Sequence, residues 1–293
     1  MVGRFIVDKF WGGLGGEVIE TNAYAKHPET KKLQPYDSAF WIASGLSILN
    51  FDNDFFEMVR QGKIHVHSAD VQKLSRSTVH LTDGTELKAD VLVCATGWKK
   101  DPTIKFINFG PAGIGLPQSQ EEQAKLAKQA DDKILSWYPR LQNQPKLGFE
   151  QKSDPFRLYR FMIPPARMDL RNIAFAGMVS STRTTDQANA QAIWISAFLD
   201  GRLDKIASSP EEVAEEVMLH TQWGKWRYPY GYGANLPDLA FDGQAYIDLL
   251  LRDCGLEIHR KAGNYADLTE PWGPQDYVGL VAVVVSFEPR HRA

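Results

Sequence analysis

The sequence predicts an α/β fold in which a β-meander and part of a parallel sheet pack against helices. Apolar residues alternate at period two in short segments from residue 62 to residue 88, with Asp83-Gly84 as a hairpin turn. A nearly uniform apolar run follows at residues 91–95. From residue 118 onward, segments with helical spacing alternate with a short apolar strand at residues 172–176.

Composition narrows the class of protein before any motif is considered. The chain has 293 residues, of which 43% are hydrophobic and 24% charged, so it can bury a core without disulfides or metals. Its 33 basic and 36 acidic residues give a net charge of -3, and no long basic run favours nucleic acid as a partner. The longest apolar run, at residues 278–287, is shorter than the roughly 20 residues of a membrane helix, so we expect no transmembrane segment. Two unpaired cysteines indicate a reduced, cytoplasmic protein.

The pattern divides the chain into three parts. We expect a loop and helix segment at residues 1–60, the β-meander with the apolar strand at 61–117, and a mainly helical part with an aromatic-rich tail at 118–293. The first part contains the glycines of GGLGG, but Val18 stands where a dinucleotide fingerprint needs its third glycine. These glycines therefore indicate a structural loop. An amphipathic helix is expected at 52–60.

The apolar strand at residues 91–95 lacks alternation, which predicts that both of its faces are covered. Its carboxyl end carries Thr96, Gly97 and Trp98. Ligands of open α/β sheets bind at the carboxyl ends of strands, so this corner is the first place where a ligand is plausible. A tight turn after a buried strand is the alternative interpretation, and packing is the favoured role for Trp98.

A second corner follows the strand at residues 172–176. Gly177 closes that strand, and a Ser/Thr-rich loop leads to a helix expected at 186–199, capped by Thr185. The buried stripe of this helix is expected to consist of Ile193, Ala197 and Phe198. The free N–H groups at the start of a helix favour a negatively polarised ligand, although helix capping alone explains such a loop. Further helices are expected at residues 118–137, from residue 210, and in the segment AYIDLLLRDCG.

Three segments carry a resemblance to a known family. ADVLVCATGW at 89–98 resembles the strand and turn near the end of the nicotinamide domain of class B flavin monooxygenases. LYRFMIPPARMDLRNIAFAGMVSS and AQAIWISAFLDG, within 158–201, resemble the point where those chains re-enter the FAD domain. The tail, from RYPYGYG to EPWGPQDYVGLV, is similar to fungal members of this flavin-containing monooxygenase superfamily.

The resemblance implies a partial two-dinucleotide-binding-domain flavoprotein that uses FAD and NADPH. Both glycine fingerprints of the family are absent, so the chain looks like the portion without the amino-terminal FAD-binding half. The last dozen residues also depart from the family's usual ending. In the family, the flavin activates oxygen while the protein excludes water and orients the reactants, so few acid or base side chains are needed.

The resemblance also implies which residues face the cofactors. In the first corner these are Thr96, Gly97 and Trp98, where glycine permits close backbone approach. In the second corner, Gly177 and the following loop lead to Thr184, Thr185 and Gln187, and Gln191 lies one helical turn further on. The two corners are expected to converge on the edge of the flavin ring.

Other reactive side chains are expected to be structural. Trp194 is predicted to pack in the core, and Arg160 and Arg183 to be solvated in preference to holding a phosphate. Cys94 is expected to be inert in its apolar strand. Two histidines at 65 and 67 lack a third ligand, so no metal site is expected.

The leading functional hypothesis is an FAD- and NADPH-dependent monooxygenase that oxidises a small lipophilic metabolite at nitrogen, sulfur or a ketone, in fungal secondary metabolism. One alternative is an inactive remnant that acts as a binding or partner protein, because both phosphate cradles are absent. Another is one half of a split enzyme whose second chain supplies the fingerprints. Uncovered sheet edges would then favour self-association or a partner chain.

Overall fold

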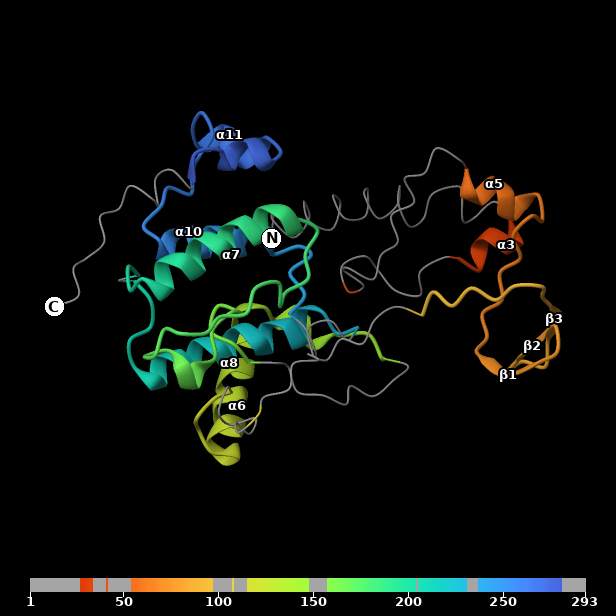
Figure 1. Cartoon of the computed structure of the whole chain (residues 1–293), viewed down its shortest axis with the longest axis horizontal. Helices are drawn as coiled ribbons and strands as arrows, with labels where there is room; N and C mark the ends of the chain where they lie inside the picture. Colours follow the sequence, from red (N-terminus) through yellow and green to blue (C-terminus); the bar gives the residue numbers. More distant parts are fainter. Residues whose placement is uncertain are drawn as a thin grey trace. The chain divides into compact units, whose positions relative to one another are not determined.

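The computed structural model describes residues 27–33, 41, 54–96, 107, 115–147, 157–203, 205–230 and 237–280. The chain forms two compact units, shown in Figure 1. The first unit comprises Met1–Phe40 and Leu46–Lys99, and the second comprises Trp41–Gly45 and Lys100–Ala293. The main hydrophobic core lies in the second unit.

The first unit contains two short helices and a three-stranded antiparallel sheet (Figure 1). Its helices are α3 (Pro28–Lys31) and α5 (Phe55–Arg60). Its strands, in spatial order, are β1 (Val71–Ser75), β2 (Thr78–Leu81) and β3 (Glu86–Lys88). An antiparallel meander at residues 71–88 and the helix expected near residues 52–60 are therefore confirmed.

The turn between β2 and β3 forms where the sequence predicts it. Gly84 has φ +87°, a left-handed conformation that glycine adopts without a steric penalty. The carboxylate of Asp83 accepts a hydrogen bond of 2.9 Å from the backbone N–H of Thr85. Both features are local, which explains why two adjacent residues are enough to predict the turn.

Two segments of this unit that the sequence predicts to be strands do not form strands. Residues 63–67 and residues 91–95 have no strand pairing among the described residues. The side chains of Val91 and Val93 are 78% and 81% exposed, so the second run is not covered on both faces. An apolar run becomes a central strand only where neighbouring strands accept its backbone hydrogen bonds, and the described strands pair only with one another. Cys94 is consequently exposed, not buried.

The second unit is built from helices. The longer ones are α6 (Gln120–Trp137), α7 (Thr184–Leu199), α8 (Pro210–Arg227) and α10 (Gly243–Asp253). Shorter elements are α11 (Asn264–Thr269) and the 3-10 helices η3 (Pro139–Gln142), η4 (Pro165–Arg167) and η5 (Pro274–Tyr277). α7 packs on α10 and α6 on α8, as Figure 1 shows. Among the described helices, none has the length and apolar character to cross a membrane.

The expected parallel sheet is not found in the described part of the second unit. Residues 172–176 run without strand pairing, although Phe175 donates a backbone hydrogen bond of 2.8 Å to Met162. The parallel pairing described here is a single bridge between Ser180 and Asp238. Within this segment Ala174 packs against the main core, whereas residues 172 and 176 are exposed.

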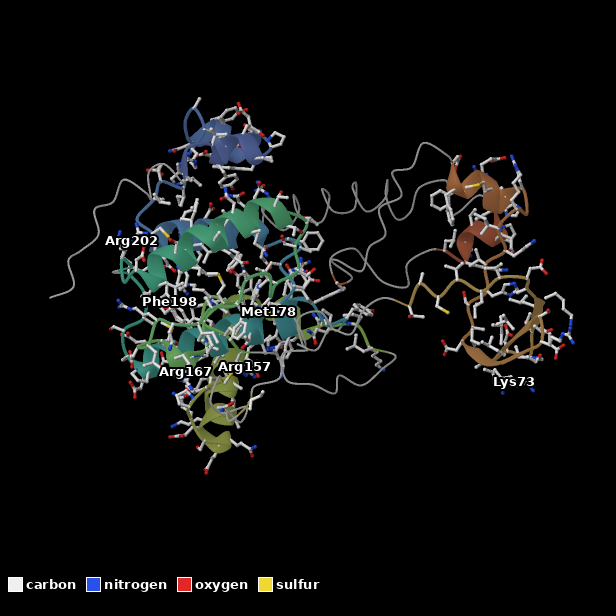
Figure 2. All side chains as sticks on the ribbon, viewed as in Figure 1. Lys73, Arg157, Arg167, Met178, Phe198 and Arg202 are labelled. Carbon is white, nitrogen blue, oxygen red and sulfur yellow. The ribbon has the colours of Figure 1, made fainter. Side chains whose placement is uncertain are left out.

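The core between α7 and the rest of the unit is aromatic. Trp194 is fully buried, and its indole stacks on the ring of Phe198 with 5.3 Å between centroids. Figure 2 marks Phe198 on the inner side of α7. Ile193 and Ala197 are buried with it. The predicted stripe of α7 and the packing role of Trp194 are thus confirmed.

A buried ionic cluster joins four elements of this unit. Arg160 is 5% exposed, and its Nε donates a hydrogen bond of 2.7 Å to Oδ2 of Asp253 at the end of α10. The same guanidinium pairs with Glu216 on α8. Trp194 on α7 donates from Nε1 to Asp253 at 2.8 Å. We call Arg160, Asp253, Glu216 and Trp194 the Arg160 cluster. The expectation that Arg160 is solvated is wrong, because the fold supplies two carboxylates for it.

The Arg160 cluster holds an unusual turn. Arg160 and Phe161 have φ values of 51° and 58°, which cost non-glycine residues about 1–3 kcal/mol each. The turn is closed by antiparallel backbone hydrogen bonds of 2.8 and 2.9 Å between Tyr159 and Ile163. Because every side chain of this turn is buried, the surrounding packing and the ion pairs must offset its conformational cost.

We predict that Asp253→Asn lowers the free energy of unfolding by about 3 kcal/mol, because it leaves the Arg160 guanidinium buried without its main counter-charge. Asp200→Asn is the matched control, since it breaks an Arg202 pair whose carboxylate is 59% exposed and should cost under about 1 kcal/mol. Urea unfolding followed by circular dichroism measures both values. Equal losses in the two variants would contradict the prediction.

A second prediction concerns His220 on α8. Burial, with a smaller contribution from the Arg160 charge, lowers its pKa from 6.5 to about 4. The unfolded chain therefore takes up a proton between pH 6.5 and pH 4 that the folded chain does not, and stability falls as the pH falls. His220→Phe should remove up to about 3 kcal/mol of this loss. Unfolding curves at pH 7 and pH 4.5 test it, and parallel losses in both proteins would contradict it.

Candidate functional site

The corner at Gly177 leads from residues 172–176 into α7. Gly177 is exposed and has φ +75°, and a Cβ added to it would meet no atom within 4 Å. Its backbone conformation, and not lack of space, is therefore what favours glycine here. Figure 2 labels the next residue, Met178, where the chain turns towards α7.

The loop after this corner is anchored to the segment that precedes α10. Ser180 donates a backbone hydrogen bond of 2.9 Å to Pro237 and accepts one of 2.7 Å from Leu239. The hydroxyl of Thr182 donates to the carbonyl of Ala240 at 3.3 Å. These bonds fix the loop before α7 against the segment before α10.

The amino end of α7 differs from those of α6 and α8. Ser119 and Ser209 cap those two helices in complete capping boxes. α7 begins after Arg183, whose side chain makes no capping hydrogen bond in the described structure. The first backbone N–H groups of α7 therefore lack an intrahelical acceptor, and the positive end of the helix dipole lies beside exposed residues. The prediction that Thr185 caps the helix is wrong, because the helix begins at Thr184 and Thr185 lies inside its first turn.

Three predicted site residues lie in the first turn of α7. Thr184 and Thr185 are exposed in its first turn, and the hydroxyl of Thr184 donates to the carbonyl of Ser181 at 3.1 Å. Gln187 lies in the same turn with its side chain turned inward. These residues bring backbone N–H groups, hydroxyls and an amide to the start of the helix, whereas the N–H of Gly177 is already bonded to Gln191.

Gln187 is the residue with an unsatisfied group. Its side chain is 2% exposed, and within the described structure its Oε1 accepts no hydrogen bond. An unsatisfied buried acceptor costs about 1–3 kcal/mol, so native proteins rarely retain one without a reason. A ligand N–H or O–H group at this helix end would satisfy it.

Gln191 is placed one turn further along the same face of α7. It is fully buried, and both ends of its amide have partners. Oε1 accepts a hydrogen bond of 3.0 Å from the N–H of Gly177, and Nε2 donates one of 2.9 Å to the hydroxyl of Tyr246. The sequence offered one signal for this pair of amides, the spacing of four residues between Gln187 and Gln191.

Arg183 is directed into the protein. Its guanidinium donates to Asp186 at 2.8 Å and to Gln244, and it lies over the ring of Tyr277 at 5.5 Å. These contacts join the start of α7 to α10 and η5, and they occupy the guanidinium. The role of Gln244 and Tyr277 was not predicted, because their partner is about sixty or more residues away in the chain.

The first predicted corner is described only in part. Thr96 is exposed and belongs to the first unit, whereas Gly97 and Trp98 lie outside the described residues, as do the glycines of GGLGG. Since Thr96 and Gly177 belong to different units, the convergence of the two corners on one ligand stays a prediction.

Metal sites, reactive thiols and grooves elsewhere in the described residues offer no clearer candidate site. No group of three metal-binding side chains occurs among them. Burial raises the pKa of the Cys254 thiol to about 12, which makes that thiol unreactive at neutral pH. A groove of about 600 Å³ lies between α6, α8 and residues 205–207. Its rim mixes lysines with glutamates, so its charge does not select one class of ligand.

No family model and no solved structure matches this chain. A protein of Aspergillus nomiae named FAD-dependent monooxygenase rstn6 is 30% identical over 287 residues, which cover 93% of this chain and 49% of the relative. FAD-dependent monooxygenase resA of Aspergillus sclerotiorum is 29% identical over 297 residues, covering 95% and 50%. An FAD-dependent monooxygenase of Pyrenophora dematioidea is 30% identical over 273 residues, covering 88% and 49%.

The chain thus spans about half the length of these curated relatives. The matches cover 93% and 95% of this chain, so the region shared with these relatives includes both corners. Over that region, the chain is homologous to fungal proteins named FAD-dependent monooxygenases.

Proposed function

We propose that this chain forms part of an FAD-dependent monooxygenase and that the amino end of α7 holds the flavin ring. The observation that carries this proposal is the uncapped start of α7 beside the buried, unsatisfied Oε1 of Gln187. A helix start favours a negatively polarised group, and Gln187 needs a donor. A flavin ring edge offers both carbonyl oxygens and an N–H group.

The residues at the corner fit such a ring. Gly177 has no side chain, and no atom lies within 4 Å of the point where a Cβ would stand. The space beside its backbone is therefore open to a ring. The backbone N–H groups of Thr184 and Thr185 and the hydroxyl of Thr185 would be available to carbonyl oxygens of the ring, whereas the Thr184 hydroxyl already donates to Ser181. Gln187 would accept from the ring N–H. In the proposed enzyme, Thr96, Gly97 and Trp98 contribute from the other corner, and Gln191 supports the site.

The bound FAD supplies the redox chemistry by which molecular oxygen is activated. The residues of this chain orient the ring and exclude water, because no acid, base or metal cluster is needed for that task. We further propose that the flavin is of the class B type, reduced by NADPH, and that the substrate is a small lipophilic metabolite of fungal secondary metabolism. In this assignment, residues 61–117 end a nicotinamide-type domain and residues 118–293 include the re-entrant portion of the FAD domain.

One observation favours a second candidate, in which the chain works only with a partner polypeptide. Val91, Leu92 and Val93 are 78%, 48% and 81% exposed, which is an unusual exposure for three consecutive apolar residues. A partner that supplies neighbouring strands would cover them. In this form the chain is one part of a split enzyme, or a binding protein that has lost redox activity.

Titration with FAD tests the leading proposal. We expect saturable quenching of flavin fluorescence by the wild-type protein. Gln187→Leu should weaken FAD binding about tenfold, because one hydrogen bond is lost, and should raise the free energy of unfolding of the FAD-free protein by about 1 kcal/mol, because an unsatisfied buried acceptor is removed. These opposite effects distinguish a ligand-binding role from a purely structural one.

Gln120→Leu is the matched control for that titration. Gln120 is an exposed glutamine in the first turn of α6, a helix start that is already capped. This substitution should change neither FAD binding nor stability by a measurable amount. Absence of flavin binding to the wild-type chain alone, with binding restored on addition of the second half of a relative, would support the split enzyme. Absence of binding in both conditions would overturn the proposal that this chain holds FAD.

A further inference from the structure

Gln191 lies at the centre of a buried chain of hydrogen bonds that starts at the Gly177 corner. The Gly177 N–H donates to Oε1 of Gln191 at 3.0 Å, and Nε2 of Gln191 donates to the Tyr246 hydroxyl at 2.9 Å. The Tyr246 hydroxyl in turn donates to the carbonyl of Arg160 at 2.8 Å. Three hydrogen bonds thus connect the exposed corner with the buried turn at Tyr159–Ile163.

The direction of each bond is determined. A backbone N–H only donates, so Gln191 must present its oxygen to Gly177 and its nitrogen to Tyr246. Burial raises the pKa of Tyr246, so its hydroxyl keeps the proton that it donates to Arg160. The ring of Tyr246 also contacts that of Phe161, with 5.6 Å between centroids. The chain of bonds therefore has a single polarity and little freedom to rearrange.

Little else in the described structure determines the orientation of the Gly177 peptide. Glycine has no side chain to pack, and no atom lies within 4 Å of where a Cβ would stand. Its left-handed φ is readily lost, because glycine has many accessible conformations. The hydrogen bond from the Gly177 N–H to Gln191 is thus the contact that ties this exposed peptide to the buried part of the unit.

We propose that Gln191 is a positioning residue that sets the backbone of the Gly177 corner and couples it to the turn held by the Arg160 cluster. This inference rests on the proposed function in so far as the corner is where the flavin ring binds. Gln191 itself does not touch the ring, since both ends of its amide are occupied within the protein and its side chain is fully buried. It acts through Gly177.

The test uses the full chain and four substitutions. Gln191→Met has a similar length and removes both hydrogen bonds, whereas Gln191→Glu keeps an oxygen acceptor for the Gly177 N–H. Tyr246→Phe removes the second and third bonds and leaves the first. Ile193→Val, on the same helix, is the control for a general loss of stability, because it deletes one buried methyl group without touching the hydrogen bonds.

The primary measurement is amide hydrogen exchange, read by mass spectrometry in overlapping peptides that isolate the Gly177 amide. Relative to wild type, we expect exchange to be at least about tenfold faster in Gln191→Met and about threefold faster in Tyr246→Phe. Gln191→Glu should stay within about threefold of wild type, and Ile193→Val should leave the ratio of Gly177 to core exchange unchanged. If Gln191→Met does not fold, Tyr246→Phe provides the same comparison.

Flavin binding is the second measurement and is read separately. If the wild-type chain binds FAD, Gln191→Met should raise the dissociation constant about tenfold and Gln191→Glu should restore most of the affinity. Unchanged exchange at Gly177 in both Gln191→Met and Tyr246→Phe would overturn the inference, whether or not FAD binds. Altered exchange in a chain that binds no flavin would support the positioning role of Gln191 and overturn only the proposed function of the corner.

Discussion

The buried ion pair between Arg160 and Asp253 is the interaction on which the second unit depends. It brings together a turn, the carboxyl end of α10, the Trp194 indole on α7 and Glu216 on α8. A buried charge without its partner is strongly destabilising, so these elements gain stability only in one mutual arrangement. The two left-handed residues of the turn are tolerated for the same reason, because the surrounding contacts leave them no alternative conformation.

The candidate site is an extension of this arrangement towards the surface. Gln191 and Tyr246 carry hydrogen bonding from the carbonyl of Arg160 to the N–H of Gly177. The corner and the start of α7 are consequently more ordered by buried groups than an exposed loop normally is. α6 and α8, by contrast, satisfy their helix starts with their own Ser and Glu side chains. The helix that leaves its donors free is the one connected to the buried cluster, which is the combination expected of a binding site supported by a rigid scaffold.

The wrong predictions for the two strands and for Arg160 have the same reason. Residues 91–95 and 172–176 both have the apolar composition of a central strand, yet neither pairs within the described structure. Composition reports that a segment is suited to burial, but pairing depends on neighbours that are distant in the chain. The prediction that Arg160 is solvated was wrong for the same reason, because its two carboxylate partners lie 56 and 93 residues away in the chain. Cys94 was expected to be buried because it lies in the segment 91–95, and it is exposed because that segment does not pair.

The sequence by itself determined the features whose hydrogen bonds close within a few residues. These are the Asp83-Gly84 turn, the meander of residues 71–88 and the apolar stripe of α7, and the residues at the start of α7 could be proposed from that pattern and from a resemblance. Only the tertiary structure decided that Gln187 keeps an unsatisfied acceptor, that Gln191 bonds inward, and that Arg160 and Arg183 are occupied by carboxylates. A buried polar group is defined by partners from other elements, and no local pattern specifies which partners the fold will bring to it.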